Sequence, residues 1–261
     1  MTAHLLSLAA GTVPEFSPAE TVAAAAAAGF DASGVWVDLT TWTPAVAAEV
    51  RTRLNDTGLR ALDAEVIRLA ADRPLDDARR VVDIAAEVGA EYALTISLDP
   101  DLARTASQYA ELCAHGASVG VRPVLEFMRF TTVRTLADAV AVVSDAGHAA
   151  GAVLVDALHL DRGAGTPAEV DALDPTLLPY AQLCDAPAAR PPDDGLIDEA
   201  LNGRLLPGDG DLPLAALIDA FAPTTPFSME LRSAALRNAY PDAVDRAAVV
   251  LTASRAMLAD H

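Results

Sequence analysis

The sequence predicts an α/β protein built as a single (β/α)8 TIM barrel. Short segments typical of β-strands alternate with alanine-rich segments typical of helices from one end of the 261 residues to the other. The strand segments show little polar alternation, which favours a parallel sheet covered on both faces. Eight such units in about 250 residues match the size of a closed barrel. An open, doubly wound sheet is the alternative, but no glycine-rich loop follows the first strand to hold a dinucleotide.

The expected strands follow one another at regular spacing. They are residues 4–10, 33–39, 59–67, 91–97, 121–128, 152–158, 178–186 and 226–232. The helices between them begin and end at recognisable residues. In the first, Ser17 and Glu20 form an expected capping box around Pro18, and Gly29 ends the helix. Two later helical segments, which end at positions 89 and 120, also close on glycine.

One connection is longer than the others. Residues 186–211 follow the seventh strand and are rich in Pro, Gly and Asp, a composition typical of a lid over a site. Their "PGDGD" resembles a phosphate loop, but no Lys and Ser/Thr pair follows it, so it indicates turns. We therefore expect one domain over residues 1–261, with a lid-like insertion at 186–211.

Composition excludes several classes of function. With 37 acidic and 18 basic residues the net charge is −19, which repels nucleic acid and anionic membrane surfaces. Every basic residue is Arg, so the lysine that a Schiff-base or pyridoxal-phosphate enzyme needs is missing from the sequence. The start of the chain does not match a secretion signal, and no segment is long and apolar enough to span a bilayer. We expect a cytoplasmic protein with a small-molecule substrate; homo-oligomerisation is left open.

Polar residues mark the ends of four consecutive strands. They are Glu126, Asp156, Gln182 and Glu230. The carboxyl ends of barrel strands meet at one face, so these side chains are expected to share one volume. Buried carboxylates need an opposite charge. All-oxygen ligation suits Mn²⁺ or Mg²⁺, with Co²⁺ or Zn²⁺ also able to occupy the site.

A second interpretation needs no metal. The two glutamates of this set would pair with arginines in a ring of salt bridges around the rim, with Arg122, Arg129 or Arg232 as partners. The sequence alone does not decide between the two interpretations.

His159 follows Asp156 by three positions. On a regular strand such residues face opposite sides, so the two can cooperate only if the strand ends just after Asp156 and the following loop turns His159 back over the pocket. The same condition applies to Gln182 and Asp185.

These motifs resemble the xylose isomerase-like (β/α)8 superfamily of sugar isomerases and epimerases, over essentially the full length of the chain. The matching pieces are Glu126, "D156-A-L-H159", "Q182-L-C-D185" and Glu230. The resemblance implies one divalent metal ion bound by Glu126, Asp156, Gln182 and Glu230, and a contact from His159 to substrate oxygen. Histidine is usual at the position of Gln182. Glutamine there is similar to the 3-dehydroshikimate dehydratases of this superfamily, in which the amide oxygen is a metal ligand.

The resemblance implies an isomerase or epimerase of sugars that moves a proton α to a carbonyl through an enediolate held by the metal. Glu126 and Glu230 would move the proton, and His159 would donate a hydrogen bond to the developing oxyanion. A dehydratase (lyase) that expels a β-hydroxyl is the alternative, and Gln182 favours it. Related epimerases carry a glutamate and an arginine where this chain has Thr132 and Ala188, so sugar hydroxyls would be held differently.

Further residues are candidates for substrate binding. Arg68 follows the third strand and Arg204 lies in the insertion, and either arginine could clamp a carboxylate or phosphate, or pair with a surface acid instead. Asp185 is a third candidate. A nuclease of this superfamily, with several zinc ions on many histidines, is disfavoured by five histidines and by the net charge of −19.

Overall fold

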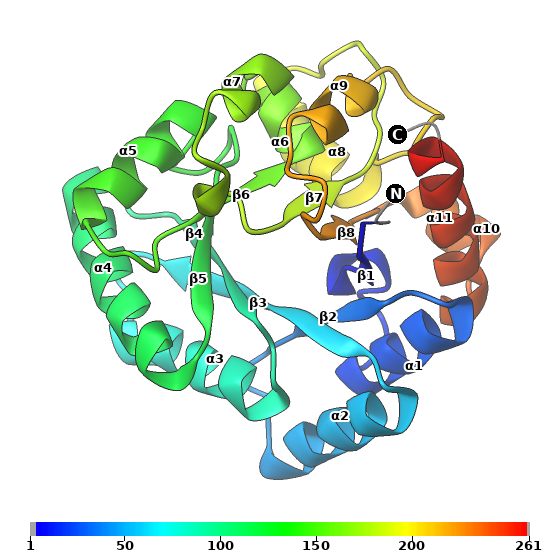
Figure 1. The fold of residues 1–261 in the computed structure, drawn as a ribbon, viewed down its shortest axis with the longest axis horizontal. Helices are drawn as coiled ribbons and strands as arrows, with labels where there is room; N and C mark the ends of the chain where they lie inside the picture. Colours follow the sequence, from blue (N-terminus) through cyan, green and yellow to red (C-terminus); the bar gives the residue numbers. More distant parts are fainter. Residues whose placement is uncertain (1–3, 260–261) are drawn as a thin grey trace.

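The computed structural model describes residues 4–259, and its eight parallel strands close into a barrel in which each strand pairs with the next and β1 pairs with β8 (Figure 1). The predicted (β/α)8 architecture is confirmed. The strands are β1 Leu6–Leu8, β2 Ala32–Trp36, β3 Arg60–Leu69, β4 Tyr92–Ser97, β5 Arg122–Glu126, β6 Val153–Asp156, β7 Ala181–Leu183 and β8 Phe227–Met229. Each overlaps a predicted strand, although most are shorter than expected.

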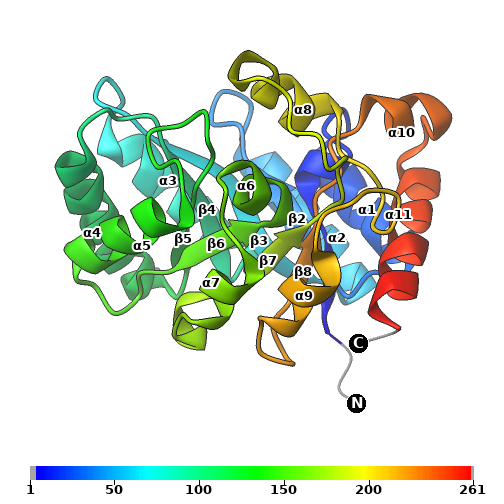
Figure 2. The ribbon, with the colours of Figure 1, turned by 90° about the horizontal axis from the view of Figure 1, so that it is seen from above.

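Helices surround the barrel, as the views in Figures 1 and 2 show. They are α1 Pro18–Ala28, α2 Pro44–Thr57, α3 Leu75–Val88, α4 Leu102–Val119, α5 Leu136–Ala146, α6 Ala157–Arg162, α7 Pro167–Asp171, α8 Leu196–Asn202, α9 Leu214–Asp219, α10 Ala234–Ala239 and α11 Ala243–Leu258. No helix among residues 4–259 is long and apolar enough to cross a membrane.

The predicted start and stop of α1 are confirmed. The Ser17 side chain accepts a hydrogen bond from the Glu20 N–H, and the Glu20 carboxylate accepts one from the Ser17 N–H. Gly29 ends the helix at φ 92°, a left-handed conformation that glycine adopts without strain. The glycines after α3 and α4 end those helices in the same conformation.

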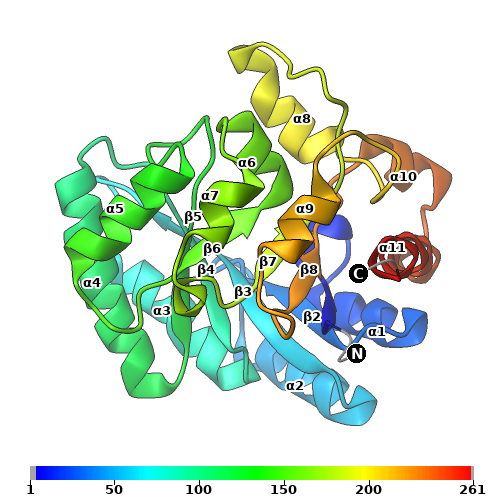
Figure 3. The same cartoon turned by 45° about the horizontal axis from the view of Figure 1, so that its top comes forward.

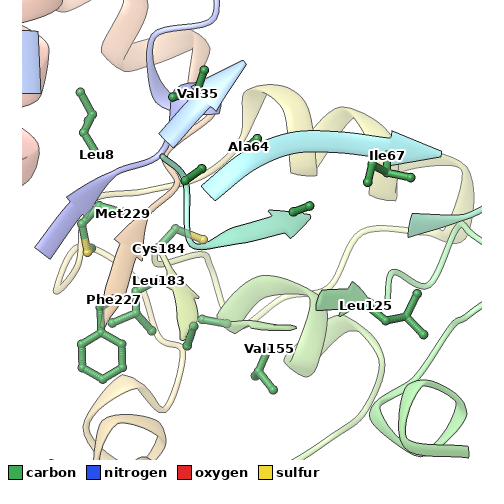
Figure 4. Packing of buried hydrophobic residues seen from close by; sticks show 14 of the residues in the cluster. Leu8, Val35, Ala64, Ile67, Leu125, Val155, Leu183, Cys184, Phe227 and Met229 are labelled. Carbon is green, nitrogen blue, oxygen red and sulfur yellow. The ribbon is translucent and has the colours of Figure 1, made fainter. Parts of the chain in front are cut away.

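The core has an outer and an inner part, because successive side chains of a strand face opposite sides. Outward-facing residues such as Leu125, Val155, Leu183 and Met229 pack against the helices (Figure 4). The residues next to them face the barrel interior and form a smaller cluster: Leu62, Leu94, Val124, Leu154 and Tyr180 belong to it. The four predicted site residues continue this inner set toward the carboxyl ends of the strands.

The insertion 186–211 is ordered and contains α8. Isolated antiparallel bridges join Asp185 to Leu205 and Gly203 to Ser233. The insertion therefore packs back onto the ends of the seventh and eighth strands, and α8 lies beside α10 (Figure 3). "PGDGD" forms the expected turns, with Gly208 at φ 91°.

Candidate active site

Three buried carboxylates and one buried amide converge at the carboxyl ends of β5 to β8. Glu126 is the last residue of β5, Asp156 is the last residue of β6, and Glu230 directly follows β8. Gln182 lies in β7, in register with Asp156 on one side and with Ser228 on the other. All four site residues are buried. The predicted shared volume thus exists on the inner face of four neighbouring strands.

A helix, and not a loop, brings His159 to this site. β6 ends at Asp156 as required, but α6 begins at once, and the Asp156 carboxylate caps it by accepting a hydrogen bond from the His159 N–H at 3.0 Å. The turn of helix places His159 Nε2 3.9 Å from Glu126 Oε1. Phe130 packs edge-on against the imidazole, with 5.6 Å between ring centroids.

Three donor atoms could hold a divalent metal ion, but the third comes from His159 and not from Glu230 of the predicted set. One ligand atom each from Glu126, Asp156 and His159 lies within 4.8 Å of the others. Gln182 is fully buried, yet neither its amide oxygen nor its amide nitrogen has a hydrogen-bond partner among residues 4–259. A buried amide without partners is costly. A metal ion beside Gln182 would give the amide oxygen a partner, which the carboxylates alone cannot do.

Arg204 of the insertion is the arginine that meets the carboxylates. Its guanidinium donates to Asp156 Oδ2 at 2.6 Å and lies 3.1 Å from Glu230 Oε2. It also lies 3.4 Å from His159 Nε2. Arg122, considered above as a rim partner, instead donates to the backbone carbonyls of residues 150, 151 and 176.

The three site carboxylates and Arg204, which contacts two of them, do not balance in charge by themselves. Three carboxylates and one guanidinium, all ionised, leave two negative charges, which one divalent ion would neutralise. Burial raises the pKa of Asp156, but Arg204 outweighs it and holds that pKa below its ordinary value. Burial, and then the charges of Glu230 and Asp156, raise the pKa of Glu126 well above the usual range. Glu126 is the carboxylate that most needs a metal ion to stay ionised.

Sequence reasoning missed Glu65 on β3. Its side chain lines the same cavity, is almost fully buried, and accepts one hydrogen bond from the Ala10 N–H at 3.0 Å. Burial, followed by the charges of Asp63 and Glu230, raises the pKa of Glu65 well above its ordinary value. Asp63 and Glu65 stand two positions apart in "LDAEV", a pattern that looks like the solvent face of a strand. In a barrel strand it can equally face the interior.

A cavity of about 180 Å³ opens beside the carboxylates. Its lining combines apolar side chains, including Trp36 and Phe130, with Arg68, Arg204 and Arg232. Arg68 donates to the Val66 carbonyl at 3.3 Å, and Arg232 lies over Trp36 at 5.6 Å from the ring centroid. Neither of these two arginines is ion-paired with a carboxylate in the part of the chain that the structure describes.

Asp185 does not line this cavity. Its carboxylate accepts backbone N–H groups from Ala186, Gly208, Gly210 and Leu212, at 2.9 to 3.0 Å. These bonds use its oxygens to shape the insertion. Of the predicted substrate contacts, the structure therefore brings His159, Arg68 and Arg204 to the cavity and leaves Asp185 outside it.

The sequence profile of one protein family, described as "Xylose isomerase-like TIM barrel", matches residues 22–252. The chain belongs to the xylose isomerase-like TIM barrel family. No curated protein sequence matches the chain significantly. The members and neighbours known from solved structures are related to it at low sequence identity.

Three solved structures illustrate the likeness. A fusion protein of a xylose isomerase-like TIM barrel and 4-hydroxyphenylpyruvate dioxygenase has a TM-score of 0.83 and 21% identity over 98% of this chain and 43% of the other, so this chain spans less than half of that protein. The zinc-bound IolI protein has a TM-score of 0.83 and 14% identity over 98% of each chain. The probable 3-DHS dehydratase AsbF of Bacillus anthracis, involved in petrobactin synthesis, has a TM-score of 0.76 and 14% identity over 96% of this chain and 99% of the other.

These likenesses establish the fold of this xylose isomerase-like barrel. In this chain, Glu126, Asp156 and His159 form a group that could hold a divalent metal ion. Most members of the family are enzymes.

Proposed function

We propose that the chain is a metal-dependent dehydratase that removes the proton α to a carbonyl of an anionic hydroxy-carbonyl compound and expels a β-hydroxyl as water. The observation that carries the proposal is Gln182, a fully buried amide without partners beside three carboxylates. Glu126, Asp156, Gln182 and Glu230 would hold Mn²⁺ or Mg²⁺. When bound, such an ion supplies Lewis acidity that makes the α-proton easier to remove.

His159 is the group we assign to proton removal. Burial lowers the pKa of its imidazole to about 4, so the ring is neutral at pH 7 and can accept a proton. The Asp156 carboxylate accepts the backbone N–H of His159 and so fixes the first turn of α6, which carries the ring. Arg204 lies beside Nε2 and holds Asp156 and Glu230 in place.

Glu65 is placed to return a proton to the leaving hydroxyl. Burial raises its pKa well above the ordinary value, which favours the protonated form, and its side chain lines the same cavity as His159. One proton then passes from carbon to His159, one passes from Glu65 to the leaving oxygen, and water departs. Transfer of a proton from His159 back to Glu65 resets the two residues.

Two arginines support an anionic substrate. Arg68 and Arg232 line the cavity, and within residues 4–259 neither is ion-paired with a carboxylate, in a chain with twice as many acids as arginines. An arginine without an ion pair beside a cavity is well suited to bind a carboxylate or phosphate through two parallel hydrogen bonds.

Isomerisation or epimerisation of a sugar is the second candidate. Glu126 and Glu230 come from β5 and the end of β8 and both line the cavity, an arrangement that suits two bases working on one carbon. Because Glu230 is paired with Arg204, it is a weaker base than Glu126. We therefore favour dehydration over epimerisation.

The two reactions are separated in D₂O with Mn²⁺-loaded protein. With 3-dehydroshikimate as substrate, dehydration gives a conjugated product with new ultraviolet absorbance and a mass lower by one water. With a ketohexose, epimerisation gives deuterium at the α carbon and otherwise conserved mass. Activity on the ketohexose alone would overturn the first candidate. Absence of either activity, with Mn²⁺ shown to bind, would overturn both.

A further inference from the structure

Two buried arginines tie the insertion 186–211 to the barrel, and only Arg204 touches the site. The other, Arg162, is the last residue of α6 and is almost fully buried. It forms a two-pronged ion pair with Glu199 of α8, with Nε and Nη2 at 2.9 and 2.7 Å from the two carboxylate oxygens. Arg162 also donates to the Pro187 carbonyl at 2.7 Å and pairs with Asp161.

This ion pair joins two segments that each supply a group to the active site. α6 carries His159, one helical turn before Arg162. α8 carries Glu199, and Arg204 follows it by five residues, with its Nε bonded to the Ala200 carbonyl of the same helix at 3.1 Å. A shift of α8 would therefore move Arg204 relative to His159 and the carboxylates.

We propose that the Arg162–Glu199 ion pair is a latch that keeps the insertion closed over the cavity and so positions Arg204 against Asp156 and Glu230. Neither latch residue touches the cavity, so both are positioning residues. The latch does not depend on which reaction the enzyme performs, whereas its catalytic consequence rests on the proposed function.

The ion pair favours the closed insertion because Arg162 is buried. Removal of Glu199 leaves a buried guanidinium without its main counter-charge, and opening of the insertion relieves this by admitting water. The closed state then becomes less populated, although the Pro187 carbonyl and Asp161 still hold Arg162 in part.

The two cysteines of the chain report on opening. Both are fully buried, but Cys184 Sγ lies 3.2 Å from the Arg204 guanidinium, next to the bridge between Asp185 and Leu205, while Cys113 lies in α4. The Cys184 thiol has no exposed surface in the closed structure, so a thiol reagent cannot reach it there. Opening of the insertion would expose Cys184, and only global unfolding would expose Cys113 as well.

The test is the labelling rate of each cysteine by a thiol reagent under native conditions, resolved by peptide mass spectrometry. We expect Glu199→Gln to speed labelling of Cys184 at least about tenfold and to leave Cys113 unchanged. Arg162→Lys keeps the positive charge but cannot form the two-pronged ion pair, so it should accelerate labelling of Cys184 less than Glu199→Gln does. The double variant Arg162→Gln with Glu199→Gln should label no faster than the faster single variant, because the two residues act as one unit.

The matched control is Glu91→Gln, which breaks the ion pair with Arg60 at the opposite end of the barrel and should alter neither rate. Equal acceleration of both cysteines would mean a general loss of stability and would overturn the latch. Unchanged labelling of Cys184 in Glu199→Gln would overturn it too.

Activity on 3-dehydroshikimate adds a separate result. A latch raises KM about tenfold in Glu199→Gln while kcat changes less than twofold, because fewer molecules are closed before substrate binds. A drop in kcat alone, with KM unchanged, contradicts the positioning role. A protein that shows the labelling pattern but no activity keeps the latch and loses the proposed function.

Discussion

The side chain of Gln182 lowers the stability of the metal-free protein but is suited to bind a metal ion. Its amide is fully buried with no partner on either atom, in register with Asp156 on the neighbouring strand. A residue that served only packing would be replaced by an apolar side chain of similar size at no cost. The amide is therefore explained by what it binds.

Replacement of Gln182 by leucine should have opposite effects on stability and on metal binding. Metal-free Gln182→Leu is expected to be at least as stable as the wild type, because the unpartnered amide is gone, while its affinity for Mn²⁺ falls by about tenfold or more. Urea unfolding and titration calorimetry measure the two quantities. Gln108→Leu on α4, whose amide oxygen also lacks a partner, is the control and should leave Mn²⁺ affinity unchanged. Equal affinity in both variants would remove Gln182 from the ligand set.

Asp63 beneath the site makes stability depend on pH. Burial raises the pKa of Asp63 to about 6 from 3.8, and Tyr180 donates to its carboxylate at 2.7 Å. Between these two values the folded protein binds more protons than the unfolded chain, so this contribution is present below pH 4 and is lost as pH rises through 6.

Asp63→Asn should remove that dependence. The variant is expected to gain stability relative to the wild type as pH rises from 4 to 7, by at most about 3 kcal/mol. Urea unfolding at several pH values measures the difference, and exposed Asp56→Asn serves as the control. If the free energies of unfolding of Asp63→Asn and the wild type differ by a constant amount across this range, the pKa of Asp63 is not raised in the folded state.

At the scale of elements, the parts that local chemistry determines were predictable. The capping box and Gly29 predicted both ends of α1, terminal glycines predicted the ends of α3 and α4, and apolar segments predicted all eight strands. Two features were not predictable. α6 has no signal of its own, because its cap is the site residue Asp156, and Arg204 reaches the carboxylates through the fold of a long insertion. Glu65 was missed because a barrel strand buries the face that an open sheet can leave to solvent.

The capping box of α1 gives a test at this scale. Ser17→Ala should lower the free energy of unfolding by about 1 kcal/mol, because the Glu20 N–H loses its acceptor at the start of the helix. Urea unfolding measures the loss. Ser118→Ala, in which the removed hydroxyl donates to a carbonyl inside α4, should change the free energy by less than about 0.5 kcal/mol. Equal effects would mean that the cap contributes nothing specific.

At the scale of the whole molecule, the negative net charge of the chain is opposite in sign to the two arginines that line the cavity without an ion pair among residues 4–259. The chain carries a net charge of −19, yet Arg68 and Arg232 face the cavity without ion pairs. An anionic substrate is therefore repelled at long range and bound at short range. Salt screens the first effect far more than the second, because the arginines lie within a partly enclosed cavity.

Raising ionic strength should therefore increase kcat/KM for an anionic substrate. Between roughly 20 and 200 mM NaCl we expect a rise on the order of twofold to tenfold with 3-dehydroshikimate, since long-range repulsion is screened at the higher salt. Steady-state kinetics at fixed Mn²⁺ measure it, with a neutral ketohexose as comparison. A fall in kcat/KM with added salt would mean that the arginines govern the approach of substrate as well as its binding.

Asp156 ends β6 and caps α6, and it is also one of the proposed metal ligands. A substitution at position 156 made to change the preferred ion would therefore also remove the cap of α6 and alter the local backbone. Glu230 caps no helix, since α10 starts from Ser233. A substitution of Glu230 can therefore change ion preference without the loss of a helix cap.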